Sequence, residues 1–202
     1  QIPGTAPLSL PYDFGATQTY PLGTALKEFT GRAWRYGQQN ATTLAVTGEL
    51  QQTPVPSANL DELVMAAAAV GARSLTITLG ATGITADVPN GGFVVIEDDA
   101  GEGYAYLIED APTIAGSAAG AISLAHGVEV AITAASTCAI LNHPGKLVLV
   151  HPSPPTAPIY GMAAGPIATS NFGWYQIRGL AAVTTEGTVV IAQKVRASES
   201  GD

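Results

Sequence analysis

The residues of this 202-residue sequence that could support catalysis or metal binding are three histidines, one cysteine and a run of carboxylates. No two of His126, His143 and His151 have the His-x-x-x-His spacing that places two zinc ligands on one helix face. Cys138 lies in an apolar run with no adjacent cation to stabilise a thiolate, so we expect a buried small hydrophobe. A single cysteine also excludes an internal disulfide. These residues predict no metal centre.

The carboxylates of segment 97–103, Glu97, Asp98, Asp99 and Glu102, are a possible calcium loop. Their spacing differs from that of an EF-hand loop, where ligands alternate and a glutamate closes the site. We therefore predict a solvated hairpin turn here.

Sequence motifs of catalysis are missing as well. The sequence contains neither a Gly-x-Ser-x-Gly nucleophile elbow nor a Gly-Lys-Ser/Thr phosphate loop. We therefore expect a protein that is not an enzyme and binds no cofactor. A triad assembled from residues distant in sequence, as in a β-barrel hydrolase, is the alternative that the sequence leaves open.

Composition narrows the possible partners. The chain is 47% hydrophobic and only 12% charged, against about 25% charged residues in an ordinary globular domain. Eight Lys and Arg against sixteen Asp and Glu give a net charge of −8, which argues against direct binding of nucleic acid. No apolar run reaches the roughly 18 residues of a membrane-spanning helix, so we expect no membrane partner. So little charge on the exterior predicts self-association, most simply as a trimer.

Short apolar runs separated by turn residues predict an all-β fold, a barrel or a sandwich. Segment 74–79 alternates apolar and polar residues, as a half-buried strand does. Segment 59–70 is ambiguous, because Asn59 and Glu62 form a capping pair ahead of an alanine run. We predict a strand there, since everything downstream is β, with helix as the alternative.

Proline-rich segments at 53–56 and 151–158 mark the boundaries between modules. The predicted organisation is an extended arm at 1–21, a β-domain from 22–52 together with 159–196, a second or inserted β-module at 59–150, and a fraying tail at 197–202.

Four prolines in the first 21 residues predict the extended arm. Its aromatic residues Tyr12, Phe14 and Tyr20 need a surface, which we expect to be a neighbouring subunit. A loose terminus is the alternative.

Trp174 lies in the middle of a predicted strand, the first of a three-strand meander with strands at 172–178, 180–183 and 189–192. Trp174, Gln176 and Arg178 share one face and are predicted to form the centre of an interface, since they combine an aromatic ring with polar and charged groups. Tyr175 and Ile177 on the other face are predicted core.

A second aromatic strand is predicted at 31–36, after a turn at Thr30 and Gly31. Trp34 between Arg32 and Arg35 could be a stacking patch for nucleic acid. The net charge of −8 favours a packed cross-strand aromatic instead.

Two stretches carry a family resemblance. One is the strand Gly173-Trp174-Tyr-Gln176 with its following glycine-punctuated strands, and the other is the run Gly31-Arg-Ala-Trp34-Arg-Tyr36-Gly ahead of Ala45-Val-Thr-Gly-Glu-Leu50. Both resemble the capsid decoration (cement) proteins of tailed bacteriophages, notably those of marine phages. The alanine run that ends at Gly71 resembles a β-module of phage virion proteins.

The resemblance implies a virion structural protein on the capsid exterior, which binds the major capsid protein, often as a homotrimer, and stabilises the lattice without a cofactor. An adhesive or carbohydrate-binding β-module of a head fibre or surface appendage is the alternative, and exposed aromatics on loops would favour it.

Overall fold

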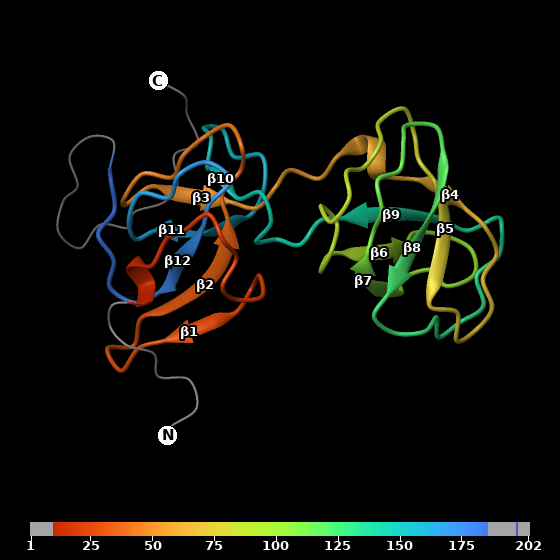
Figure 1. Ribbon diagram of the computed structural model, residues 1–202, viewed down its shortest axis with the longest axis horizontal. Coiled ribbons are helices and arrows are strands. Elements are labelled where there is room, and N and C mark those ends of the chain that lie inside the picture. Colours follow the sequence, from red (N-terminus) through yellow and green to blue (C-terminus); the bar gives the residue numbers. More distant parts are fainter. Residues whose placement is uncertain (1–9, 186–196, 198–202) are drawn as a thin grey trace. The chain divides into compact units, whose positions relative to one another are not determined.

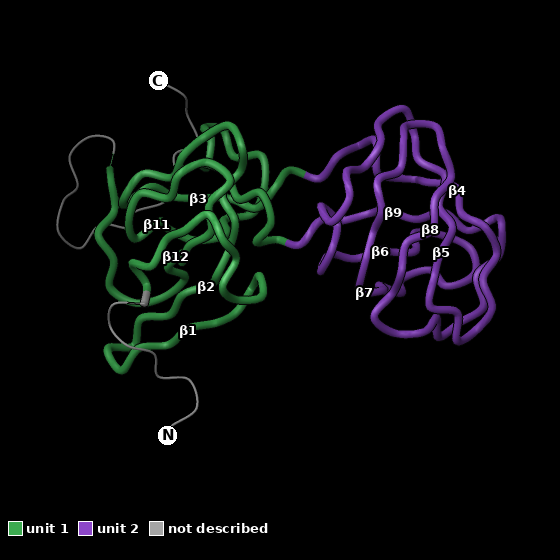
Figure 2. The backbone as a smooth tube through the Cα atoms, viewed as in Figure 1, with its two compact units in different colours: residues 1–55, 144–202 green, residues 56–143 purple. Residues whose placement is uncertain are grey.

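The computed structural model describes residues 10–185 and residue 197, and within this part of the chain almost all regular structure is β (Figure 1). The chain divides into two compact units. Unit 1 comprises residues 1–55 and 144–202, and unit 2 comprises residues 56–143, so that one unit is inserted in the sequence of the other (Figure 2). The predicted all-β fold class is confirmed.

Unit 2 is a closed antiparallel barrel with the strand order β4-β5-β8-β7-β6-β9. Strands β6, β7 and β8 follow one another as neighbours, and β9 returns to pair with β6, which is a Greek-key arrangement. The strands are β4 (Leu63–Met65), β5 (Ser74–Thr78), β6 (Phe93–Ile96), β7 (Ala105–Asp110), β8 (Ala119–Leu124) and β9 (Thr137–Leu141).

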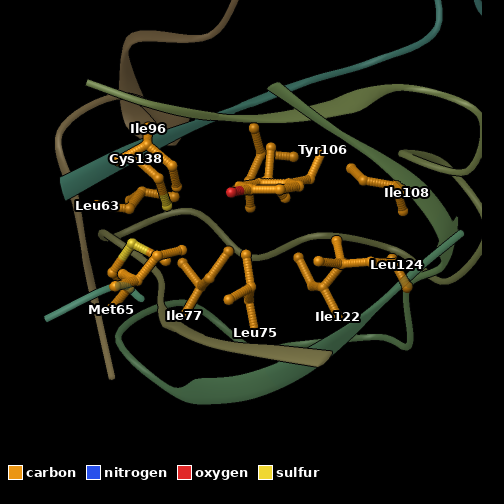
Figure 3. Packing of buried hydrophobic residues seen from close by; sticks show 14 of the residues in the cluster. Leu63, Met65, Leu75, Ile77, Ile96, Tyr106, Ile108, Ile122, Leu124 and Cys138 are labelled. Carbon is orange, nitrogen blue, oxygen red and sulfur yellow. The ribbon is translucent and has the colours of Figure 1, made fainter. Parts of the chain in front are cut away.

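The barrel interior is a single apolar cluster to which every strand contributes (Figure 3). In β5, Leu75 and Ile77 point inward while Ser74, Thr76 and Thr78 are exposed, which confirms the predicted half-buried strand. Such alternation follows from the two-residue period of a strand, because successive side chains point to opposite faces.

The ambiguous segment 59–70 is a strand where it enters the barrel. A 3-10 turn, η2 (Ala58–Leu60), precedes β4, and Val64 is paired with Thr78 on one side and Thr137 on the other. Gly71 ends the segment with φ +84°, a left-handed conformation that glycine adopts without strain. The strand prediction is confirmed for Leu63–Met65 only, and in the alanine run Ala68 makes an isolated bridge with Ile132 instead of a helical turn.

Unit 1 is built on a six-stranded antiparallel sheet with the order β1-β2-β12-β11-β3-β10. The strands are β1 (Ala25–Lys27), β2 (Ala33–Gln38), β3 (Leu50–Gln52), β10 (Leu149–Val150), β11 (Ile159–Ala163) and β12 (Phe172–Arg178). Segments from both ends of the sequence therefore meet at the centre of the sheet, where β2 pairs with β12 (Figure 1).

Two boundaries and one strand differ from the sequence predictions. Strand β10 pairs with β3 and belongs to unit 1, so the inserted module ends at residue 143 and not at 150. Residues 10–21 also belong to unit 1, where a 3-10 turn, η1 (Leu10–Tyr12), is followed by pairing of Gly15 with Phe172. Segment 180–183 forms no strand. The predicted strand at 189–192 and the predicted tail at 198–202 lie outside the described residues.

Candidate interaction surface

Trp174 is buried inside unit 1, where it is only 1% exposed. Its ring centroid lies 5.1 Å from that of Tyr36 and 5.3 Å from that of Tyr20, and Trp34, Leu26 and Phe172 complete the same cluster. The predicted packing of Trp34 as a cross-strand aromatic is thereby confirmed. The predicted interface role of Trp174 is wrong, because its surface is already covered by the same chain.

Gln176 is buried on the same face as Trp174. Its Nε2 donates hydrogen bonds to the backbone carbonyls of Arg178 (3.0 Å) and Leu180 (2.9 Å), which hold the chain as it leaves β12. Gln176 therefore has a structural role instead of the predicted interface role. Of the three β12 residues predicted to form the interface centre, Trp174, Gln176 and Arg178, only Arg178 is exposed.

Ile177, predicted to lie in the core, is 43% exposed, whereas its predicted partner Tyr175 is fully buried. The register between β12 and β2 shifts after Gln176, so that Ile177 and Arg178 together face Ala33. A bulge of this kind bends the strand and re-aims its side chains. The core prediction is confirmed for Tyr175 and wrong for Ile177.

Both faces of β12 are buried over Phe172–Gln176, which explains these errors. The cluster around Trp174 covers one face. A second cluster covers the other face and consists of Ala45, Val148, Tyr160, Ala163, Ile167 and Tyr175. The predictions assumed one buried and one free face, as in an ordinary two-layer β-domain.

The aromatic residues of the predicted arm pack mainly on their own unit. Tyr20 lies on Trp174 and Tyr36, and the Tyr36 hydroxyl accepts a hydrogen bond from the backbone N–H of Thr19 (3.1 Å). Phe14 packs against the Tyr175 cluster. Tyr12 is 52% exposed. The extended-arm prediction is therefore wrong for residues 10–21, and residues 1–9 lie outside the described residues.

Two glycines, Gly165 and Gly173, are the sequence signal that could have indicated where the Phe14 ring packs. A Cβ atom at Gly165 would come within 2.6 Å of the Phe14 ring, and one at Gly173 within 2.8 Å. Contacts this short do not occur for real side chains, so the ring fits only because both positions are glycine.

A buried polar network that the sequence predictions missed links β12 to the loops of unit 1. The Tyr175 hydroxyl donates to Gln39 Oε1 (2.8 Å), and Gln39 Nε2 donates to Gln51 Oε1 (3.3 Å) and to the Thr43 carbonyl (3.0 Å). Burial raises the pKa of the Tyr175 hydroxyl, so it stays a hydrogen-bond donor at any physiological pH. The network ties strands together inside a low-dielectric core.

The turn between β1 and β2 presents the most exposed aromatic residue of the described chain. Phe29 is 78% exposed at this turn. Beneath it, the buried Glu28 carboxylate accepts hydrogen bonds from Arg32 Nε (2.7 Å) and Thr30 Oγ1 (2.9 Å). Gly31, with φ +83°, donates its N–H to the Glu28 carbonyl (3.1 Å). Phe29 is therefore held out on a preorganised loop.

Arg32 connects this loop to its surroundings. The Tyr12 hydroxyl and the Glu28 carboxylate raise the pKa of Arg32, and the guanidinium carbon lies 5.3 Å from the centroid of the Trp34 ring. Contacts on three sides fix the base of the loop. Sequence reasoning predicted the turn at Thr30 and Gly31 but assigned no role to Phe29.

The acidic segment 97–103 is a hairpin loop whose carboxylates are held by the barrel. Asp98 Oδ1 accepts from Thr137 N–H (3.0 Å) and Oγ1 (3.1 Å), and Asp99 accepts from the Thr133 hydroxyl. Glu97 Oε2 accepts from the Glu62 N–H (3.0 Å). Burial and the neighbouring Asp61 raise the pKa of Glu97. Within residues 10–185, no three His, Cys, Asp or Glu side chains are grouped in a way that could hold a metal ion.

Charge is divided very unequally between the two units. Unit 2 contains ten carboxylates and one cation, Arg73, a net charge of −9, whereas unit 1 contains six carboxylates and seven cations, a net charge of +1. The acidic pole of unit 2 is one end of the barrel and consists of Asp61, Glu62, Glu97, Asp98, Asp99 and Glu102.

The basic patch of unit 1 consists of Lys27, Arg35 and Arg178, together with Ile177. Lys27 and Arg178 are the register partners of Ala33 on its two sides, and Arg35 lies two residues further along β2. All three cations are exposed. The one salt bridge in the described residues joins Arg32 to Glu28, so these cations have no anionic partner there.

Three comparisons were made, with protein families, with curated proteins and with solved structures. None gives a match. In the part of the chain that the structure describes, no helix is long and apolar enough to span a membrane.

Proposed function

We propose that this protein is a virion structural protein that binds the outer surface of a tailed-phage capsid and stabilises its lattice, with the major capsid protein as its partner. The proposal rests on the sequence resemblance together with the all-β architecture of two compact units. The observation that carries it is Phe29, a large aromatic side chain held 78% exposed on a rigid loop.

A loop of this kind is suited to docking on a protein lattice. Aromatic anchors that fill a pocket in the partner dominate the binding energy of most interfaces. The Glu28–Arg32 salt bridge and Gly31 order the loop before binding, which lowers the entropic cost of docking. The proposed function is binding without catalysis or cofactor, on the capsid exterior.

Quantitative mass spectrometry of purified virions, with immunogold labelling of intact particles, tests the location. The expected result is a protein in fixed stoichiometry with the major capsid protein and gold on the heads. Label confined to tails, or absence from the particles, would overturn the proposal.

Rebinding of purified protein to stripped heads tests the role of Phe29. We expect Phe29→Ser to weaken binding about tenfold or more, as loss of an interface anchor does. The matched control is Val70→Ser, which removes another exposed apolar side chain, on unit 2. Equal binding by the two variants would contradict an anchoring role.

A second candidate function is supported by the placement of the exposed aromatics. Tyr12, Phe29 and Tyr104 all lie outside strands, and of the exposed aromatics in the described chain only Phe93 is on one. Aromatic side chains on loops are typical of an adhesive or carbohydrate-binding module. Binding of the purified protein to a glycan array, lost in Phe29→Ser or Tyr104→Ser, would favour this function over capsid attachment.

A further inference from the structure

We propose that copies of this protein associate head to tail, with the basic patch of unit 1 in one copy bound to the acidic pole of unit 2 in the next copy. The inference gives contact surfaces to the homotrimer that the composition and the sequence resemblance lead us to expect. It replaces the Trp174 face, which is buried within the monomer.

The basic patch is the first surface. Three of the eight cations of the whole chain, Lys27, Arg35 and Arg178, lie around one residue of β2. These cations have no anionic partner among the described residues, and like charges this close together repel one another and are stabilised by an acidic partner. Ile177, which is 43% exposed and precedes Arg178 at the bulge of β12, adds an apolar side chain to the patch. An apolar centre with a charged rim is the usual composition of an interface.

The acidic pole is the complementary surface. Five of its six acidic residues are exposed, and three of the six are oriented by hydrogen bonds from Thr133, Thr137 and the Glu62 N–H. Arg73, the single cation of unit 2, comes directly before the first residue of β5. The pairing of β5 with β4 is at the opposite end of the strand, at Ile77 and Thr78. The pole is thus an ordered anionic surface without an internal counter-charge.

Charge complementarity indicates that the partner of each surface is a second copy of this chain. Every copy carries both surfaces, one on the unit of net charge +1 and one on the unit of net charge −9. A contact between two different surfaces is heterologous. It generates a closed ring such as a trimer when the rotation from one copy to the next adds up to a full turn.

Charge reversal on purified protein, without capsids, tests the inference. In sedimentation equilibrium we expect self-association that weakens roughly tenfold or more between about 0.05 M and about 0.5 M salt, because screening acts on exposed charges. Arg35→Glu with Arg178→Glu, and separately Glu62→Lys with Glu102→Lys, should each weaken association by about tenfold or more at low salt.

The decisive sample combines the two reversals. One chain that carries all four substitutions should associate more tightly than the Arg35→Glu/Arg178→Glu chain, and its loss should be smaller than the sum of the two separate losses, because the new Lys side chains attract the new Glu side chains. The matched control for the basic patch is Arg73→Glu with Lys146→Glu. The matched control for the acidic pole is Glu109→Lys with Glu129→Lys. Both control variants should associate as the wild-type protein does. Thermal melts verify that each variant is folded.

A protein that stays at 20.5 kDa at low salt overturns the inference. So does association that salt and charge reversal leave unchanged, which would indicate an apolar interface. Because no capsid is involved, neither result bears on the proposed capsid attachment, which the virion experiments test separately.

Discussion

Tyr20 packs on Trp174 with their ring centroids 5.3 Å apart, and this contact makes the N-terminal segment part of the core of unit 1. Tyr20 also meets Tyr36 edge to face, with centroids 5.3 Å apart. Aromatic pairs in these geometries each contribute about 0.5–1.5 kcal/mol beyond their buried area. Residues 10–24 therefore stabilise the sheet that they cover.

Deletion of residues 1–20 is accordingly expected to destabilise unit 1. The truncation removes Tyr20 and Phe14 and exposes Trp174 and Tyr36 to water. Tyr20→Ala alone should lower the free energy of unfolding by roughly 2–3 kcal/mol, somewhat less than truncation of a fully buried aromatic. Chemical denaturation followed by tryptophan fluorescence measures both.

Deletion of residues 1–9 is the matched control, since it leaves Phe14 and Tyr20 in place. A 1–20 deletion that unfolds at the same denaturant concentration as this control would contradict the packing role of the segment.

Substitutions on β12 should separate buried from exposed positions. Trp174→Ala is expected to cost about 3–5 kcal/mol of stability, as large-to-small changes in a core do. Ile177→Ala should change stability by roughly 0.5 kcal/mol or less, because its side chain is largely exposed. Urea denaturation of the two variants gives the comparison, and equal losses would show that Ile177 is core after all.

Gly173→Ala tests the close approach of Phe14 to β12. The added Cβ would lie 2.8 Å from the Phe14 ring and 2.7 Å from Ile167, so we expect a loss of about 1–3 kcal/mol from overpacking. Gly15→Ala, whose Cβ would meet nothing closer than 4.0 Å, is the control.

A double-mutant cycle with Phe14→Leu shows whether Phe14 is the obstacle. The cost of Gly173→Ala should fall in the Phe14→Leu background, since the smaller side chain frees space. Strict additivity of the two changes would argue against the contact.

The pH dependence of barrel stability should reflect Glu97. Burial and Asp61 raise the pKa of Glu97 in the folded state, so the folded barrel binds the proton more tightly than the unfolded chain does. The stabilisation from its protonation is complete below the unfolded pKa of about 4.3 and is lost as pH rises through the higher folded pKa.

Glu97→Gln should therefore raise the melting temperature at neutral pH and have little effect below about pH 4. Glu109→Gln, an exposed carboxylate of β7, is the control. Melting curves across this pH range in which both variants shift alike would refute the role of Glu97.

The Cys138 thiol should be unreactive in the native protein. It is fully buried in the barrel, and burial raises its pKa to about 12, so almost no thiolate exists at pH 8. Ellman's reagent should modify it only after unfolding. Rapid modification of the folded protein would mean that the barrel opens at this site.

The amino-acid sequence by itself determined the all-β fold class and the half-buried strand that became β5. Alternation in segment 74–79 was enough to assign Leu75 and Ile77 to the core, because a strand that lines a closed barrel has one buried face. The net charge of −8 and the apolar surroundings of Cys138 could also be predicted, because the first depends only on composition and the second on residues adjacent in the sequence.

Only the tertiary structure decided which residues of β12 are available to a partner. Burial of both faces depends on residues 10–24 and on Tyr160 and Ile167 lying over the strand, and no local pattern in segment 172–178 encodes them. The basic patch likewise joins Lys27 and Arg35 to Arg178, more than 140 residues away, through the pairing of β2 with β12. Side chains that meet through strand pairing are neighbours in space and not in sequence, so their collective charge appears only when the sheet forms.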